Sequence, residues 1–167
     1  MLVRVKGVKM QAKKVSETKV NMVQTMSPED ANPAGNVQGG VIMKLVDLAG
    51  GIVAHRHSRM NSVTASVDRI DFLHPVHIGD VVFAKASLNM VGKTSMEIGV
   101  RVESENPLTG EIRHTASAFL TYVALDKNGK PAKVPRLILE TSEDKRRNKE
   151  AQARRDARLR DRFKEQD

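Results

Sequence analysis

An aspartate stands inside the most apolar segment of the chain. Residues 39–57 read GGVIMKLVDLAGGIVAHRH, and Asp47 is the only acidic residue among them. An ionised carboxylate that is buried without a partner is strongly destabilising. We therefore expect Asp47 to act as a general base in a functional pocket, unless it only pairs with Lys44 or lies at a subunit contact.

A turn and two glycines precede this segment. Asn32-Pro33-Ala34-Gly35 is followed by Asn36 and then by Gly39-Gly40, where a helix is expected to begin. The first N–H groups of a helix lack intrahelical partners and lie at the positive end of its dipole. Glycines let a ligand approach this backbone closely. The helix start therefore suits a polarised carbonyl or a developing oxyanion.

The spacing of these groups indicates a shared site. Gly40 and Asp47 are seven residues apart, which is about 10.5 Å of helix rise. A carboxylate cannot easily share a small reacting group with the start of its own helix. Two antiparallel copies of the helix would bring Asp47 of one chain near Asn36 and Gly40 of the other, so a two-fold dimer would hold two composite sites.

The elements around these residues follow from hydrophobic periodicity. Apolar residues cover nearly every face of 39–57 at helical spacing, which predicts a helix buried on all sides. Period-two alternation or long apolar runs predict strands at 19–26, 62–72, 81–90, 95–102 and 112–125. A parity switch predicts a bulge near Asp68 or Arg69, and residues 91–94 form a plausible hairpin turn. We expect an α+β fold with an antiparallel sheet curled around a central helix.

The two ends of the chain differ from this body. Residues 141–167 hold ten basic and seven acidic residues, and Ser142 with the acidic residues after it suits a helix start. Glu150 and Arg154 are spaced to pair, while Leu159 and Phe163 are expected to dock lightly on the body. We divide the chain into a basic N-terminal arm (1–14), a central domain (15–135) and a charged C-terminal helix or tail (136–167).

Composition excludes several classes of protein. The net charge is +8 and there is no cysteine, so disulfides, thiolate zinc sites and cysteine nucleophiles are excluded. No apolar run approaches the ~18 residues of a membrane helix, and the N-terminus lacks a secretory apolar stretch. We therefore expect a soluble cytoplasmic protein without membrane insertion. The histidines complete no recognisable zinc set, and serine-elbow, Walker and dinucleotide motifs do not occur.

Four separated blocks carry a family resemblance: GNVQGGVIMKLVDLAGGIVAHRH, NSVTASVDRIDF, GKTSMEI and ASAFLTYVAL. In this order they resemble the hotdog-fold acyl-CoA thioesterases, in particular the cytosolic acyl-CoA hydrolase branch that includes brain acyl-CoA hydrolase and the bacterial YciA-like enzymes. The resemblance runs from about residue 27 to residue 135. It implies a hotdog domain that hydrolyses acyl-CoA thioesters to free fatty acid and CoA, with no cofactor beyond the CoA of the substrate.

The resemblance also implies roles for single residues. The catalytic asparagine of the family falls on Asn36 and its catalytic aspartate on Asp47, which act across a subunit interface. The thioester carbonyl would be polarised by the N–H groups of Gly40 and Val41. A chain with one hotdog repeat requires a homodimer, and a trimer of dimers is usual. One departure is Gln38, where several relatives have histidine.

A second group of residues is implied for CoA. The turn from Gly92 to Ser95 matches a family turn near the CoA tail, where Lys93 would offer charge and Thr94 or Ser95 a hydroxyl. The turn is equally consistent with an ordinary hairpin. Arg56, in a basic cluster at the end of the helix, would meet phosphate or only complement the helix C-terminus.

Other functions stay open at this point. A hotdog hydratase or dehydratase usually needs a histidine near a buried carboxylate, and the loop NPAGNVQGG has none. A non-catalytic acyl-CoA-binding regulator would share the fold. Specific nucleic-acid binding is disfavoured, because the C-terminal segment mixes charges and lacks stacking aromatics. The sequence does not fix the acyl length, nucleotide regulation, or the choice between hexamer and tetramer.

Overall fold

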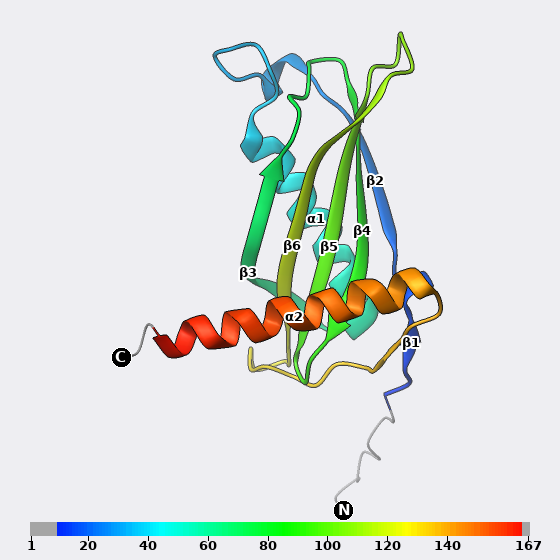
Figure 1. Cartoon of the computed structure of the whole chain (residues 1–167), viewed down its shortest axis with the longest axis vertical. Helices are drawn as coiled ribbons and strands as arrows, with labels where there is room; N and C mark the ends of the chain where they lie inside the picture. The colour runs from blue at the N-terminus through cyan, green and yellow to red at the C-terminus, as the bar shows by residue number, and fades with distance from the viewer. Residues whose placement is uncertain (1–9, 165–167) are drawn as a thin grey trace, which may run out of the picture.

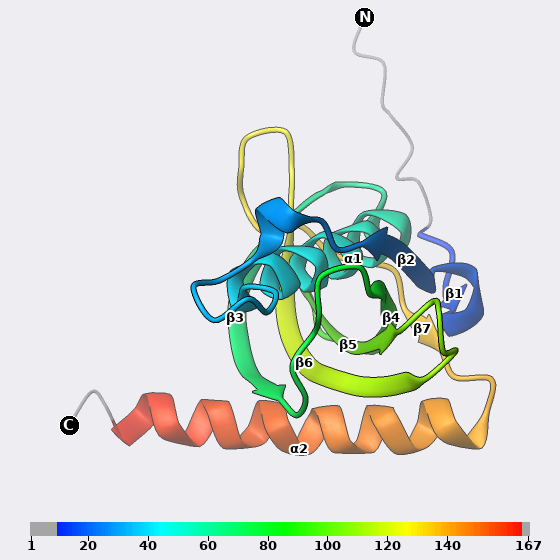
Figure 2. The ribbon, with the colours of Figure 1, turned by 90° about the horizontal axis from the view of Figure 1, so that it is seen from above.

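A curved antiparallel sheet wraps around one long helix (Figures 1 and 2). The computed structural model describes residues 10–164, with side chains described through residue 161. The elements are β1 (Lys13–Lys14), β2 (Val20–Thr25), α1 (Gly39–Ser58), β3 (Asn61–Phe72), β4 (Val81–Val91), β5 (Ser95–Glu105), β6 (Ile112–Leu125), β7 (Leu137–Ile138) and α2 (Ser142–Lys164). The five-stranded sheet has the order β2-β4-β5-β6-β3, and all its pairs are antiparallel.

The core lies between α1 and the inner face of the sheet. Alternate residues of β4, β5 and β6 point inward and are buried, as period-two patterning requires. Leu88, Ile98, Leu120 and Tyr122 are among the largest fully buried side chains. The predicted fold class, the central helix and the five strands of the sheet are therefore confirmed.

The edge strand β3 is irregular. Its pairing with β6 shifts between Thr64 and Ser66 and again between Val67 and Arg69. The second shift confirms the bulge predicted near Asp68, while the first was not predicted. Each bulge adds one residue to β3 and changes which side chains face the helix.

One face of α1 is not covered by the rest of the described chain. Met43, Leu48 and Ile52 are 47%, 45% and 38% exposed, whereas Val46 and Val53 on the opposite side are fully buried. The prediction of a helix buried on all sides is therefore wrong for the single chain. The sheet reaches around only part of the helix, so an apolar stripe remains open.

Helix α2 begins with a capping box. The side chain of Thr141 accepts a hydrogen bond from the Asp144 N–H at 3.0 Å, and the Asp144 carboxylate accepts one from the Thr141 N–H at 3.1 Å. These bonds satisfy backbone donors that a helix start leaves free. The cap therefore lies at Thr141, one residue before the predicted Ser142.

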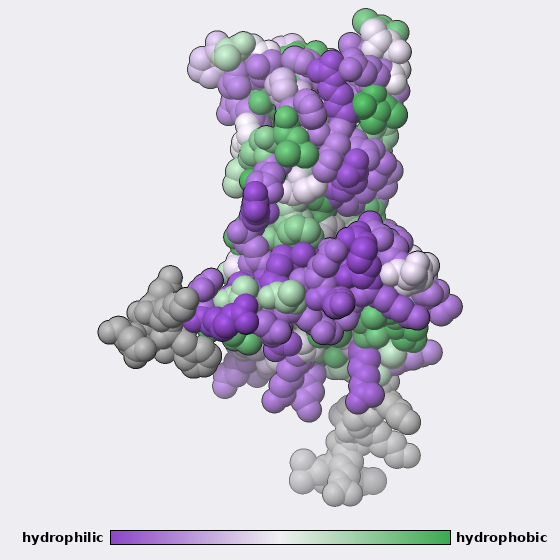
Figure 3. All heavy atoms as spheres, in the orientation of Figure 1, coloured by the Kyte–Doolittle hydropathy of each residue, from purple (hydrophilic) through white to green (hydrophobic). Residues whose placement is uncertain are grey.

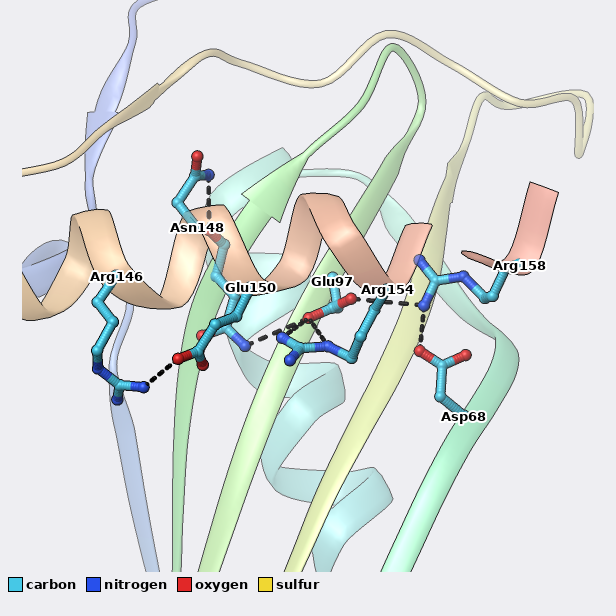
Figure 4. A network of polar contacts seen from close by, with 8 residues as sticks. Asp68, Glu97, Arg146, Asn148, Glu150, Arg154 and Arg158 are labelled. Carbon is cyan, nitrogen blue, oxygen red and sulfur yellow. Dashed lines mark hydrogen bonds and ion pairs between the residues drawn. The ribbon is translucent and has the colours of Figure 1, made fainter. Parts of the chain in front are cut away.

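Buried charge holds α2 against the outer face of the sheet (Figure 4). Glu97 of β5 is 1% exposed and accepts a hydrogen bond from Arg154 at 2.6 Å. Arg158 contacts Glu97 at 3.4 Å and also pairs with Asp68 of β3. The Arg154 guanidinium lies 3.7 Å from the centre of the Phe119 ring, a cation–π contact. Helix α2 thus bridges β3, β5 and β6.

These contacts correct two predictions for the C-terminal segment. Leu159 is exposed, so the helix docks through arginines, and the Phe163 side chain lies outside the described residues. Glu150 pairs with Arg146 at 2.6 Å instead of with Arg154. The side of α2 that faces the viewer is strongly hydrophilic (Figure 3). Arg154 pairs with Glu97 of the sheet instead, because a buried carboxylate without a charged partner would be strongly destabilising.

The predicted N-terminal arm is only partly described by the structure. Residues 1–9 of the N-terminal arm lie outside them, and β1 pairs in parallel with β7 beside the body. The division into arm, domain and tail stays a prediction. Within residues 10–164, no helix is long and apolar enough to cross a membrane.

Candidate active site

The carboxylate of Asp47 lies on the uncovered face of α1 and is exposed in the single chain. Its Oδ1 atom accepts a hydrogen bond from the Thr64 hydroxyl at 2.5 Å and one from the Tyr122 hydroxyl at 3.1 Å. The predicted functional pocket around Asp47 is therefore not formed by this chain alone, and a pocket shared with a second chain stays a prediction. Hydroxyl groups of β3 and β6 solvate one oxygen of the carboxylate in place of water.

The other carboxylate oxygen is free within the described residues. Asp47 Oδ2 has no hydrogen-bond partner there, and no ion pair within 4 Å joins Lys44 to Asp47. A carboxylate with one anchored oxygen and one open oxygen is arranged to accept a proton. The Lys44–Asp47 ion pair, which the sequence left open as an alternative, is therefore not formed within the described residues.

The start of α1 is open to a ligand. Gln38 is the N-cap, and a Cβ placed on Gly40 would meet no atom within 4 Å. The N–H of Gly40 belongs to the first turn, whose amides have no intrahelical acceptor. The N–H of Val41 donates to the Gln38 carbonyl at 3.0 Å. Gly40 therefore offers the free amide at this end, whereas Val41 already has a partner.

The turn before the helix is held by its own asparagines. Asn32 Oδ1 accepts hydrogen bonds from the N–H groups of Ala34 (2.9 Å) and Asn36 (3.1 Å). Asn36 Oδ1 lies 3.2 Å from His77 Nδ1, which donates when that nitrogen carries the proton. Both amides use their oxygen within the chain. Their NH₂ groups are left to donate to another molecule.

The single chain does not unite the predicted catalytic residues. No hydrogen bond in the described residues joins Asp47 to Asn36 or Gly40. Two hollows of about 600 and 370 Å³ border α2, and residues such as Arg101 and Phe119 line the larger one. These hollows lie on the sheet face opposite α1, away from Asp47. Asp47 therefore lines neither hollow.

The residues predicted to bind CoA lie near the C-terminal end of α1, whereas Asn36 and Gly40 lie at its N-terminal end. Lys93 is exposed in the turn between β4 and β5, while Thr94 and Ser95 are half-buried there. The backbone of this turn is fixed, since the Gly92 N–H donates to the Ser95 carbonyl at 2.8 Å. Arg56 is exposed and donates to the backbone carbonyl of residue 19 at 3.0 Å. The turn is the predicted hairpin, and its role in CoA binding stays a prediction.

Two residues at Asp47 were missed in the sequence. Thr64 carried no signal, because a single threonine in an alternating strand is common. Tyr122 offered one, since it is the only tyrosine of the chain and stands in the buried strand β6. A buried tyrosine hydroxyl usually needs a hydrogen-bond partner. Burial and the neighbouring Asp47 carboxylate raise the pKa of Tyr122 well above its usual range, so its hydroxyl stays protonated.

Metal ligation finds no support in this part of the protein. Across the described residues, no group of three or more histidine, aspartate or glutamate side chains is arranged to hold a metal ion. The side-chain groups that contact the Asp47 carboxylate in the described residues are the Thr64 and Tyr122 hydroxyls.

Comparisons with known proteins agree with this geometry. Residues 34–111 match the thioesterase superfamily. An acyl-CoA thioester hydrolase of Bacillus subtilis is 43% identical over 128 residues, which are 77% of this chain and 74% of that protein. The human cytosolic acyl coenzyme A thioester hydrolase is 38% identical over 84% of this chain, but this chain spans only 37% of its length.

Solved structures extend the agreement to three dimensions. An acyl-CoA hydrolase from Bacillus cereus has a TM-score of 0.87 and 38% identity, with 93% of this chain and 95% of that chain covered. The Staphylococcus aureus acyl-CoA hydrolase in complex with butyryl coenzyme A and coenzyme A has a TM-score of 0.85 and 32% identity, with 93% and 94% covered. A hexameric acyl-CoA thioesterase has a TM-score of 0.87 and 36% identity, with 90% and 96% covered. The chain belongs to the acyl-CoA thioester hydrolases, enzymes of the hotdog-fold thioesterase superfamily.

Proposed function

We propose that this hydrolase cleaves acyl-CoA to free fatty acid and CoA at two composite sites of a homodimer. The observation that carries the proposal is the Asp47 carboxylate, which has one oxygen anchored by hydroxyls and one oxygen open on an uncovered helix face. The predicted distance of about 10.5 Å between Asp47 and the start of its own helix supports sites shared between two chains.

The uncovered surface supports the dimer. Met43, Leu48 and Ile52 of α1 are exposed apolar residues. Val67 of the edge strand β3 is exposed as well, and it pairs with Leu120, whose side chain faces α1. A long apolar edge strand next to an open helix stripe is a surface that proteins normally cover. A second copy would bury this surface and place the start of its α1 near Asp47. The hexameric relative supports a trimer of such dimers.

The reaction follows from these groups. Asp47 of one chain takes a proton from water as the water oxygen attacks the thioester carbon. The free N–H of Gly40 and an asparagine NH₂ stabilise the negative oxygen that develops. The carbon–sulfur bond then breaks, CoA leaves as a thiolate, and this thiolate takes the proton back from Asp47. A simple thiol has a pKa of about 8.5, so the leaving group needs little acid help.

A spacing comparison bears on which asparagine acts. Solved structures of the Staphylococcus aureus hydrolase carry alanine in place of an asparagine, an aspartate and a threonine, with the aspartate 15 positions after the asparagine and 17 before the threonine. Asn32, Asp47 and Thr64 have the same spacing. This supports Asn32 as the amide of the site and Thr64 as a partner of Asp47. The assignment to Asn36 stays the prediction from the sequence.

The CoA portion of the substrate is proposed to lie along the protomer interface. Lys93, Thr94, Ser95 and Arg56 would meet its phosphates and polar tail as predicted. The acyl chain would lie against the apolar stripe of α1.

Thiol release from a series of acyl-CoA lengths tests the function. Wild type is expected to release CoA, and Asp47→Ala is expected to lower kcat by about 10²–10⁴, the range for loss of a general base. Near-normal turnover by a folded Asp47→Ala dimer would remove Asp47 from the mechanism. Binding of acyl-CoA without release by wild type would favour the regulator, and hydration of an enoyl-CoA would favour the hydratase.

A further inference from the structure

Two hydroxyl groups from different strands converge on one oxygen of Asp47. Thr64 of β3 donates to Oδ1 at 2.5 Å, and Tyr122 of β6 donates to the same atom at 3.1 Å. The single hydrogen of the Tyr122 hydroxyl is shared between Oδ1 and the backbone carbonyl of Asp47, which accepts it at 2.8 Å. Because both side-chain contacts are to Oδ1, they leave Oδ2 directed to other molecules.

The position of Tyr122 is fixed by the core. Its side chain is 1% exposed and is packed among the buried residues between α1 and the sheet. A tyrosine ring has few rotatable bonds, so a packed ring holds its hydroxyl in one place. Thr64, in contrast, stands on the exposed and irregular edge strand β3. Tyr122 is therefore the rigid one of the two anchors.

Helix α1 carries a gap that admits this hydroxyl. A Cβ placed on Gly50 would lie 2.5 Å from the Tyr122 oxygen, and a Cβ on the neighbouring Gly51 would lie no closer than 3.9 Å to the same side chain. Gly50 is three residues after Asp47, so it lies on the adjoining turn of the helix. The hydroxyl reaches Asp47 because residue 50 has no side chain.

We propose that Tyr122 is a positioning residue of the hydrolase: its hydroxyl fixes one oxygen of Asp47 so that the other faces the reacting water. The role rests on the proposed function of Asp47 as general base. The hydroxyl stabilises the ionised carboxylate through a charge-assisted hydrogen bond.

Tyr122→Phe tests the role, because it removes the hydroxyl and keeps the ring. We expect kcat to fall about 5- to 50-fold with KM changed less than about twofold, since orientation of the base is lost and substrate contacts are kept. A purely structural role would lower kcat by the same factor whether or not Asp47 is present, whereas a positioning role depends on Asp47.

Thr121→Val is the matched control. It removes the neighbouring buried hydroxyl of β6, which faces the other side of the sheet and has no hydrogen-bond partner in the described structure. We expect kcat and KM of this variant to match wild type. Unchanged kcat in a folded Tyr122→Phe enzyme would overturn the proposal, as would an equal fall of kcat in both variants.

A double variant separates this proposal from the proposed function. In the Asp47→Ala background, Tyr122→Phe should lower kcat by less than about twofold, because the group that it positions is absent. If Asp47→Ala loses activity but Tyr122→Phe does not, only the role of Tyr122 fails. If Asp47→Ala keeps wild-type activity, the proposed function fails first.

Discussion

The hydroxyl of Tyr122 and the missing side chain of Gly50 occupy complementary positions. A Cβ on Gly50 would lie 2.5 Å from the hydroxyl oxygen and 3.0–3.1 Å from two ring carbons. Real Cβ atoms do not approach other atoms so closely, and the ring cannot retreat because it is packed in the core. The glycine thus couples the packing of α1 on β6 to the anchoring of Asp47.

Gly50→Ala is expected to destabilise the protein although alanine is the better helix former. Overpacking a close contact costs about 1–3 kcal/mol, which should lower Tm by several degrees. Gly51→Ala has room for its methyl group and should leave Tm unchanged or raise it slightly. Thermal unfolding followed by circular dichroism compares the two. Adding Tyr122→Phe to Gly50→Ala should restore part of the lost Tm, and an equal Tm for both alanine variants would refute the steric argument.

Asn32 and Asn36 can be distinguished by matched substitutions to aspartate. Each replacement keeps the side-chain oxygen that accepts a hydrogen bond in the native turn and removes the NH₂ donor. Loss of a donor to a developing oxyanion typically lowers kcat by about 10²–10³. We expect that loss for Asn32→Asp and less than about tenfold for Asn36→Asp, measured by thiol release. The reverse order would return the catalytic amide to Asn36.

Periodicity was enough to predict the main body of the fold. The strands of the sheet, the hairpin between β4 and β5, and the bulge near Asp68 all follow from the alternation of side chains, which has a fixed period of two. The burial of α1 did not follow. An apolar stripe looks the same in the sequence whether the same chain or another copy covers it.

In the candidate site, too, local features could be predicted from the sequence and contacts between distant segments could not. Asp47 and Gly40 could be found from one local segment, because the charge and the glycine stand out in it. Thr64 and Tyr122 could not be assigned to Asp47, since they are 17 and 75 positions away and meet it only through the pairing of β3 with β6. The docking of α2 depends likewise on Glu97, an acid on the outer face of the sheet whose burial is a tertiary effect.

Arg154 is expected to stabilise the protein through Glu97. Arg154→Met would leave the buried carboxylate of Glu97 with longer contacts to Arg158 and Asn89, both at 3.4 Å. Removing one partner of a buried ion pair costs about 3–5 kcal/mol, and the remaining contacts place the loss near the lower end. Urea unfolding should show a lower midpoint for Arg154→Met and partial recovery when Glu97→Gln is added. Arg146→Met is the control, because Arg146 pairs at the surface of α2, and an equal loss in that variant would argue against the buried pair.

His57 is expected to make stability fall in mild acid. Its side chain is fully buried, Nε2 donates to the Pro135 carbonyl at 2.9 Å, and Nδ1 has no partner in the described residues. Burial lowers the pKa of His57 below its usual 6.5. The unfolded chain therefore binds the proton more readily than the folded one, so stability is full above about pH 6.5 and declines as the pH falls below it.

Urea unfolding of wild type and His57→Gln at pH 5.5, 7.5 and 8.5 measures this effect. The variant should be less stable than wild type at pH 7.5, because it loses a packed ring. It should lose less stability than wild type between pH 7.5 and 5.5, because residue 57 no longer gains a proton on unfolding. The difference between the two proteins should stay constant from pH 7.5 to 8.5, where His57 is neutral in both states. Parallel losses between pH 7.5 and 5.5 would show that other groups cause the acid sensitivity.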